Sequence, residues 1–312
     1  MGSFMSRRYN AFSAYMKNRF GSPVYKVIVD AGFTCPNRDG TIGSSGCIYC
    51  NNESFRPNSC NPALTVGEQI KRGIGFIRRR YKSDKFLAYF QPYTNTYAPL
   101  DELERLYKEA LANPHVIGLA IGTRPDMVDD QKIGLIQSLA EKYFVLVEYG
   151  MQSIYDKTLQ YINRGHDYRT FLSALEMTKN RDILIGVHII LGFPTETREE
   201  MLAMAEELSN LPVNFLKIHH LQIIKDTPLA VLYREDPFPM FSYDEYIDFV
   251  TEFLERLSSR IVLQRLFAAS PGNLLIAPQW EKSGQEAIRD IERRLASKDT
   301  WQGKQQKIHS AQ

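Results

Sequence analysis

The sequence has few cysteines and lacks the features of membrane and secreted proteins. Only 4 of its 312 residues are cysteine. No apolar run approaches the roughly 18 residues that a membrane span needs, and residues 1–10 lack the apolar stretch of a signal peptide. Internal repeats and low-complexity segments are also absent, and the net charge of +2 is too small to indicate a partner. We therefore expect a soluble, cytoplasmic globular protein with no membrane partner.

What the sequence does contain is a cluster of cysteines. Cys35, Cys47 and Cys50 have the spacing C-x11-C-x2-C. Thiols stay mostly reduced in the cytoplasm, so the cluster indicates metal binding or catalysis rather than disulfides. A closed zinc site takes four protein ligands, whereas three thiolates on an iron–sulfur cluster leave one iron open. The alternative is a zinc site whose remote fourth ligand is Cys60 or a histidine, although the Pro- and Asn-rich surroundings of Cys60 show no ligand motif.

Helix and strand patterns alternate along most of the chain. Short apolar stretches, typical of strands covered on both faces, lie at residues 24–29, 86–90, 116–121, 144–148, 183–190 and 213–218. Helical patterns lie between them at residues 66–81, 100–111, 129–142, 167–179 and 197–208. Right-handed crossovers then give parallel strands, and six such units favour a partial (β/α)6 barrel of the TIM type over a doubly wound sheet. In both folds, the segments after the strands form the site, and the cysteines follow the first strand.

The two ends of the chain are expected to add helices to this α/β unit. We expect an N-terminal helical cover at residues 1–22, the barrel at 23–240 and a C-terminal helical extension packed on the barrel at 241–312. Residues 224–240 contain three prolines and predict a loop. A seventh strand is expected at residues 261–266. Further helices are predicted at residues 5–20, 243–259 and 280–297.

These features resemble the radical S-adenosylmethionine (SAM) superfamily. That family has three cysteines after the first strand and an aromatic residue before the third, here Tyr49. Its usual spacing is C-x3-C-x2-C, and the longer first gap of this chain is similar to the Elongator-like branch, in particular its bacterial YhcC/YtqA-like group. The stretches that support the resemblance, in the family's order, are residues 89–97, 122–126, 148–153, 163–166, 188–194 and 217–222.

The resemblance implies two cofactors, a [4Fe–4S] cluster on Cys35, Cys47 and Cys50, and SAM on the open iron. In the family, the reduced cluster cleaves SAM to a 5′-deoxyadenosyl radical. For two of the SAM contacts implied below, another role is possible. Glu148 could instead form a salt bridge with Arg124 or Arg164, and His188 could be a hydrogen-bonded core residue that binds no ligand. The implied SAM contacts are Tyr49, Tyr93, Thr94, Asn95, Glu148, Gln152, Arg164, His188, Leu221 and Gln222.

Other polar residues are candidates for binding the substrate. Strand alternation sends Lys217 and His219 to the same face. The substrate or catalytic candidates at the barrel mouth are Lys217, His219, Lys225, Arg265 and Arg38. A basic run with a nearby tyrosine suits a phosphate backbone and unstacked bases, although a solvated helix face has the same composition. The RNA-contact candidates are Lys71, Arg72, Arg78, Arg79, Arg80 and Lys82.

The Elongator-like resemblance also implies a substrate. That branch acts on the wobble uridine of tRNA, so we expect this chain to modify or remodel a C5 side chain of the carboxymethylaminomethyl type, with a low-potential electron donor such as flavodoxin or ferredoxin. The length leaves no room for the acetyltransferase domain of the Elongator subunit. The alternatives are a radical SAM enzyme acting on a small molecule, such as a tetrapyrrole precursor, and a non-enzymatic metal-binding protein.

Overall fold

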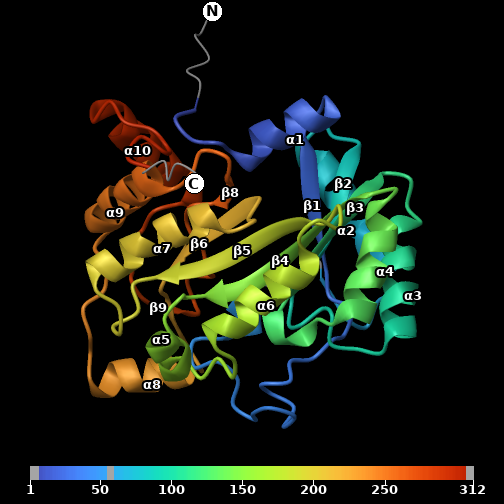
Figure 1. The fold of residues 1–312 in the computed structure, drawn as a ribbon, viewed down its shortest axis with the longest axis horizontal. Helices are drawn as coiled ribbons and strands as arrows, with labels where there is room; N and C mark the ends of the chain where they lie inside the picture. Colours follow the sequence, from blue (N-terminus) through green and yellow to red (C-terminus); the bar gives the residue numbers. More distant parts are fainter. Residues whose placement is uncertain (1–6, 55–59, 307–312) are drawn as a thin grey trace, which may run out of the picture.

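The computed structural model describes residues 7–54 and 60–306, and its centre is a curled sheet of seven parallel strands (Figure 1). The strands follow one another in chain order, apart from β7, so the sheet has no switch point of the doubly wound kind. The partial parallel barrel is therefore confirmed. The strands are β1 (Val24–Val29), β2 (Lys85–Phe90), β3 (Val116–Thr123), β4 (Phe144–Gln152), β5 (Leu184–Leu191), β6 (Phe215–His220) and β8 (Val262–Arg265).

Helices cover the outer face of this half-barrel (Figure 1). They alternate with the strands as α2 (Val66–Arg80), α3 (Leu100–Leu111), α4 (Asp130–Ala140), α6 (Tyr168–Thr178) and α7 (Arg198–Asn210). Near the C-terminus, α9 (Tyr243–Arg256) packs on α7 and on α10 (Gly284–Ser297). No helix in the described part of the chain is both long and apolar enough to cross a membrane.

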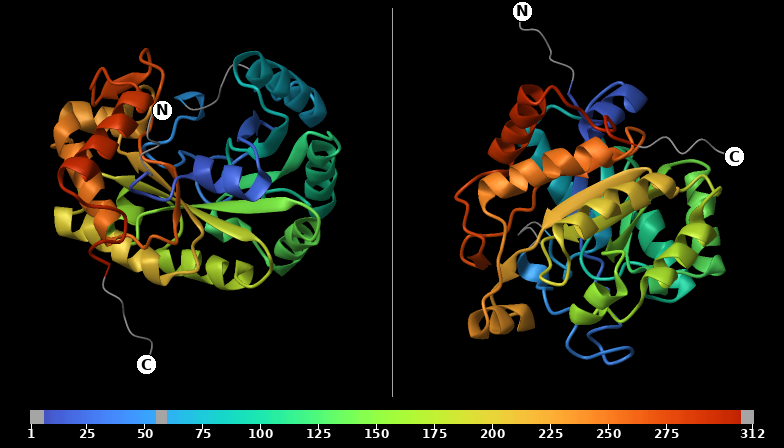
Figure 2. Two further views of the ribbon diagram at one scale, coloured as in Figure 1. Left: turned by 90° about the horizontal axis from the view of Figure 1, so that it is seen from above. Right: turned by 60° about the vertical axis from the view of Figure 1, so that its left-hand side comes forward.

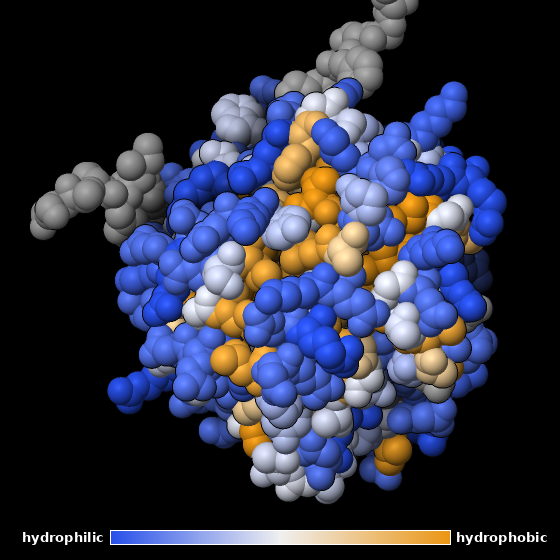
Figure 3. Space-filling model, turned by 90° about the vertical axis from the view of Figure 1, so that its right-hand side faces the viewer, coloured by the Kyte–Doolittle hydropathy of each residue, from blue (hydrophilic) through white to orange (hydrophobic). Residues whose placement is uncertain are grey.

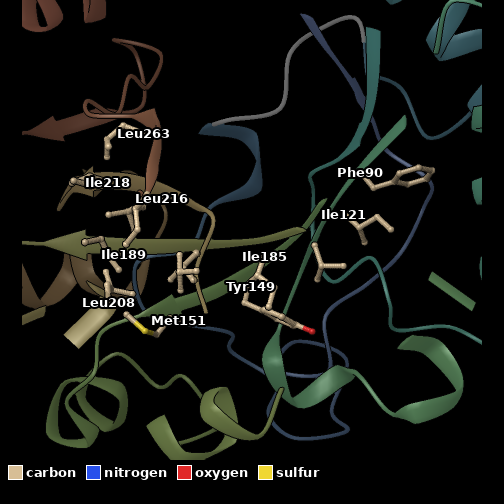
Figure 4. Close-up of a cluster of buried hydrophobic side chains, with 14 of the residues drawn as sticks. Phe90, Ile121, Tyr149, Met151, Ile185, Ile189, Leu208, Leu216, Ile218 and Leu263 are labelled. Carbon is tan, nitrogen blue, oxygen red and sulfur yellow. The ribbon is translucent and has the colours of Figure 1, made fainter. Parts of the chain in front are cut away.

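A large hydrophobic core fills the space between the sheet and these helices (Figure 4). Alternation along each strand builds it: in β5, Ile185 and Ile189 lie in this core, whereas His188 between them faces the barrel interior. Figure 4 labels Phe90, Tyr149 and other members of the core. The outer face is thus apolar throughout, and the interior face is left for polar side chains.

A short helix closes the N-terminal end of the barrel. This helix, α1 (Phe12–Phe20), lies across the end of the half-barrel (Figure 2). Its Met16 is fully buried with Leu87 and Phe215 in a second core. The Phe12 ring packs edge-on against Phe215 at a centroid distance of 5.5 Å. The barrel interior is therefore sealed at this end and opens at the other.

Two features of the fold differ from the sequence-based expectation, and a third agrees with it. The first helix begins at Phe12 because Ala11 forms a parallel bridge with Leu263; residues 5 and 6 of the expected helix lie outside the described residues. The expected loop at 224–240 contains α8 (Pro228–Glu235), which Thr227 caps and whose first residue, Pro228, needs no N–H donor there. The seventh strand is confirmed and pairs with β6.

Smaller elements were not expected from the sequence. They are α5 (Asp156–Tyr161), two 3-10 turns (Asn52–Ser54 and Pro125–Met127), and the antiparallel pair β7 (Ile223–Ile224) and β9 (Leu275–Ala277). Strands of this length have too few residues to show a strand pattern, so the sequence predicted a loop here. The C-terminal part supplies β8 to the barrel sheet, and the expected domain boundaries stay a prediction.

The packing of α1 can be tested with Met16→Ala. This change leaves a cavity in the core that seals the barrel, so we expect a loss of about 2–5 kcal/mol in the free energy of unfolding. The measurement is urea unfolding. Lys17→Ala on the exposed face of the same helix is the control and should change stability by less than about 0.5 kcal/mol. Equal effects of the two variants would contradict the role given to α1.

Candidate active site

A cavity of about 240 Å³ opens at the C-terminal ends of the strands. Strand ends and the loops that follow them supply its walls, as expected for a parallel barrel. The structure brings most of the candidate residues together around this cavity. The role of each residue in binding a cofactor or the substrate stays a prediction. Those that line it are Cys35, Arg38, Cys47, Tyr49, Cys50, Tyr93, Thr94, Glu148, Gln152, Arg164, His188, Lys217, His219, Leu221, Gln222 and Arg265.

The other candidates lie outside the cavity wall. Asn95 is fully buried, and its side chain donates to the Pro92 and Gly122 carbonyls at 3.0 and 2.8 Å. It therefore supports the turn that carries Tyr93 and Thr94, it does not line the cavity, and its contact with SAM stays a prediction. Lys225 is exposed next to β7, where its N–H donates to the Leu274 carbonyl. The six candidates for RNA contact are exposed on α2 and just after it.

The long gap between Cys35 and Cys47 is folded against the loop that follows α5. The Asn37 side chain donates to the Asn163 carbonyl at 2.6 Å, and the Asn163 side chain donates to the Gly46 carbonyl at 2.8 Å. Gly46 has a φ of 73°, and a Cβ there would lie 2.9 Å from the Arg38 side chain. These contacts fix the two ends of the loop and hold the three cysteines on one wall.

Two arginines surround the thiols. The Arg164 guanidinium lies 3.5 Å from the Cys47 sulfur, and the Arg38 guanidinium donates to the Cys50 carbonyl. Burial raises the pKa of the Cys50 thiol, and the neighbouring Cys47 raises it further. Burial would lower the pKa of Arg164, but the Cys47 thiolate raises it. Fixed positive charge is thus placed where thiolates would otherwise be costly.

The donor set fits an iron–sulfur cluster. Among the residues that the structure describes, no group of three or more His, Cys, Asp or Glu side chains is arranged to hold a single metal ion. A cluster does not need that convergence, because each thiolate binds a different iron. Cys60 lies away from this wall, buried with its sulfur 3.6 Å from the Gln69 side-chain oxygen.

Two buried guanidinium groups on the cavity wall retain donors without a protein partner. Arg124 makes a two-pronged ion pair with Asp126, and Arg164 donates to the Gly150 carbonyl at 2.6 Å. Within the described residues, Nη1 of Arg124 and Nε of Arg164 have no acceptor. An unpaired buried donor is costly, so a ligand carboxylate such as that of SAM fits here. Sequence reasoning missed Arg124 as a site residue, although the stretch 122–126 was the signal.

A buried ionic cluster forms the floor of the cavity. Glu148 is fully buried; one carboxylate oxygen accepts from Lys26 at 2.6 Å, and the other accepts from Lys217 and, at 3.0 Å, from His188. The alternative reading of Glu148, a salt bridge to Arg124 or Arg164, is therefore wrong. Gly186 gives the carboxylate room, since a Cβ there would lie 3.1 Å from the Glu148 side chain.

The charges of the floor depend on one another. Burial would raise the pKa of Glu148, but Lys217 and Lys26 lower it well below its ordinary value. Burial lowers the pKa of His188 to about 4, with help from Lys217, so this imidazole is neutral at pH 7. The His188 and His219 rings are stacked at 6.0 Å. Sequence reasoning missed Lys26, for which the only signal was one lysine inside the apolar strand β1.

Removing the carboxylate tests this cluster. In Glu148→Gln the buried Lys26 and Lys217 lose their counter-charge, so we expect a loss of about 3–5 kcal/mol in the free energy of unfolding. Urea unfolding at pH 7 measures it. The control is Glu104→Gln, which breaks only an exposed ion pair with Lys108 and should cost less than about 1 kcal/mol. A loss no larger than the control's would show that the cluster is not held as an ion pair.

Comparisons with known proteins show the family of this chain. The family model of the radical SAM superfamily matches residues 35–208, and that of the Radical_SAM C-terminal domain matches residues 213–297. The uncharacterized protein YtqA of Bacillus subtilis is 32% identical over 96% of this chain and 92% of its own length.

Two further proteins share part of the chain or its fold. A tRNA uridine(34) acetyltransferase of Methanocaldococcus infernus is 25% identical over 49% of this chain, which is 28% of that protein. The structure of Methanocaldococcus infernus Elp3 with an N-terminal deletion superposes with a TM-score of 0.70 and 17% identity over 89% of this chain and 64% of that chain. It shows the same fold. The chain therefore belongs to the radical SAM superfamily, whose members use SAM and a [4Fe–4S] cluster, and the cofactors predicted from its cysteines are confirmed.

Proposed function

We propose that this radical SAM enzyme modifies or remodels the C5 side chain, of the carboxymethylaminomethyl type, of the wobble uridine in tRNA. The observation that carries the proposal is the similarity to a tRNA uridine(34) acetyltransferase over 155 residues. This chain covers 28% of that protein's length, so the proposal takes over its nucleoside and not its acetyl transfer. The Elp3-like fold over 89% of the chain supports the same assignment.

Cys35, Cys47 and Cys50 would hold the cluster. Arg164 and Arg124 would then bind the SAM carboxylate with their unpaired donors. When bound, SAM and the reduced cluster supply a 5′-deoxyadenosyl radical, for which an electron donor such as flavodoxin or ferredoxin is needed. The protein's part is to orient both cofactors and exclude water: α1 closes the barrel below the cavity, and the cysteine loop covers it above.

The basic run on α2 is suited to bind RNA beside the open edge of the half-barrel. This helix packs on β1, an edge strand, and α9 and α10 lie on the other side of the opening (Figure 2). Phe76 and Tyr81 are 57% and 39% exposed among the arginines, with Arg79 and Arg80 over their rings. The surface on the side of α3 and α4 also has hydrophobic side chains exposed between hydrophilic ones (Figure 3). Cations interleaved with exposed aromatics suit phosphates and unstacked bases.

None of the basic side chains on α2 lines the cavity, so their role would be to position tRNA while the target nucleotide is turned out of its stack into the cavity. That division of labour predicts a separable effect. Loss of α2 charge should weaken tRNA binding and leave SAM binding intact. Cavity variants should do the reverse.

Arg79→Ala/Arg80→Ala tests the RNA surface. Each lost phosphate contact should reduce the slope of log affinity against log salt by about 0.7–0.9, and tRNA binding at low salt should weaken. Filter binding or anisotropy over a salt series measures both quantities. The matched control is Lys142→Ala/Lys179→Ala, which removes one exposed and one half-buried lysine at the same N-terminal ends of the strands but outside α2. If both double variants weaken binding equally, α2 is an ordinary solvated face.

Cys47→Ala tests the ligand assignment. With one thiolate lost, the reconstituted protein should lose most of its iron and its brown colour, because two cysteines do not retain a cubane cluster stably. Iron and sulfide analysis and the visible absorption spectrum measure this. Cys60→Ala, a buried cysteine outside the cavity wall, should keep the full iron content. Full iron in Cys47→Ala would refute the assignment.

A further inference from the structure

The floor of the cavity carries a cation, Arg265, that is not paired with any group in the described part of the chain. Arg265 is half-buried at the end of β8 and lines the cavity. Across residues 7–54 and 60–306, its guanidinium has no hydrogen bond and no ion pair, and Lys217 lies directly opposite it on β6. We propose that Arg265, with Lys217 behind it, binds a carboxylate of the substrate at the floor of the cavity.

A β-bulge turns Arg265 into the barrel. The pairing of β6 with β8 runs from Leu216–Leu263 to Lys217–Arg265, so Gln264 is an extra residue. Consecutive side chains of a regular strand face opposite ways, whereas here the Gln264 amide accepts from Lys26 inside the barrel and Arg265 lines the cavity. Bulges that re-aim one side chain occur next to active sites. The strand is therefore shaped to present this guanidinium to the cavity.

The charges of the cavity divide into two groups. At the cysteine wall, Arg38 and Arg164 face thiols, and Arg124 is paired with Asp126. At the floor, Lys26 and Lys217 pair with the single carboxylate of Glu148, and Arg265 lines the cavity without an ion pair to any described residue. Glu148 is also the only acidic residue among the described residues that line the cavity. Burial lowers the pKa of both lysines and Glu148 raises it again, so the guanidinium of Arg265, which has no partner among the described residues, is the cation that an anion would neutralise.

The two cations at the floor have different parts. Lys217 is fixed, since its ammonium donates to Glu148 and, at 2.6 Å, to the Tyr89 hydroxyl. It contributes its field and has little freedom to follow a ligand. No described residue accepts from the Arg265 guanidinium, and a planar guanidinium binds a carboxylate through two parallel hydrogen bonds. The contact would therefore be made by Arg265 and strengthened by Lys217.

The identity of the molecule that carries this carboxylate rests on the proposed function, whereas the anion site itself does not. A carboxymethylaminomethyl side chain ends in a carboxylate, which would reach the floor while the rest of the nucleoside lies toward the cysteine wall. A free acid of small size would present the same chemistry. The experiment therefore has one arm for the anion site and a second for its source.

The first arm uses the holoenzyme with cluster and SAM, and titrates ¹³C-acetate and neutral acetamide by NMR. Acetate should bind at least tenfold more weakly to Arg265→Gln than to the parent, while acetamide should not discriminate between them. Arg265→Lys should lie between, and Lys142→Gln, a remote loss of one charge, should match the parent. Unchanged acetate binding in Arg265→Gln would overturn the inference. So would a parallel tenfold loss of SAM affinity, since the site would then hold the carboxylate of SAM.

The second arm identifies the source. An anticodon stem-loop with carboxymethylaminomethyluridine is compared with its methyl ester, which has nearly the same shape and no charge. The acid should bind more tightly in the parent, and Arg265→Gln should remove the difference. Arg265-dependent acetate binding without stem-loop discrimination would keep the anion site and reject the tRNA substrate. Stem-loop discrimination that persists in Arg265→Gln would reject the inference and leave the tRNA proposal standing.

Discussion

The carboxylate of Glu148, buried between Lys26 and Lys217, joins three strands across the inside of the barrel. Lys26 comes from β1, Glu148 from β4 and Lys217 from β6, so one ionic contact links an edge strand with the middle of the sheet. Removing these charges from water costs several kcal/mol, and apolar residues of similar size would often be as stable. We take their presence as a sign that the interior is built for binding, and the rest of the cavity follows from this polar layer.

The layers of the barrel interior have distinct roles. Met16 and its apolar neighbours seal the N-terminal end, the ionic cluster forms the floor, and the cysteine loop forms the opposite wall. The loop depends on the amides of Asn37 and Asn163, which bind each other's backbone segments. The long first gap of the cysteine motif is therefore a folded part of the wall. This long gap is also the feature in which the chain resembles the Elongator-like branch. In the structure, it holds the cysteines against the segment that follows α5.

Local signals were sufficient for much of the fold. Each main strand is a short apolar run, and the helices between them have clear periodicity, so the parallel half-barrel was predictable. The helix α8 was missed because its prolines suggested a loop, although Pro228 is compatible with a first turn. The start of α1 at Phe12 depends on a bridge to Leu263, which lies far away in sequence.

The sequence predicted which residues line the cavity better than it predicted which residues they contact. The cysteines and Arg164 follow from motif order, and the structure brings them to one cavity. The partners of Glu148 could not be found, because the contact with Lys26 spans 122 residues and depends on the curvature of the sheet. The orientation of Arg265 depends on a β-bulge, which the local sequence pattern did not predict.

We propose that this chain performs radical chemistry on the wobble uridine of tRNA. The most direct measurement compares the nucleosides of total tRNA, by mass spectrometry, from cells with the gene, without it, and with the gene carrying Cys47→Ala. We expect that one C5-substituted uridine disappears and its precursor accumulates in both the deletion and the Cys47→Ala cells. Identical nucleoside profiles in all three would contradict it.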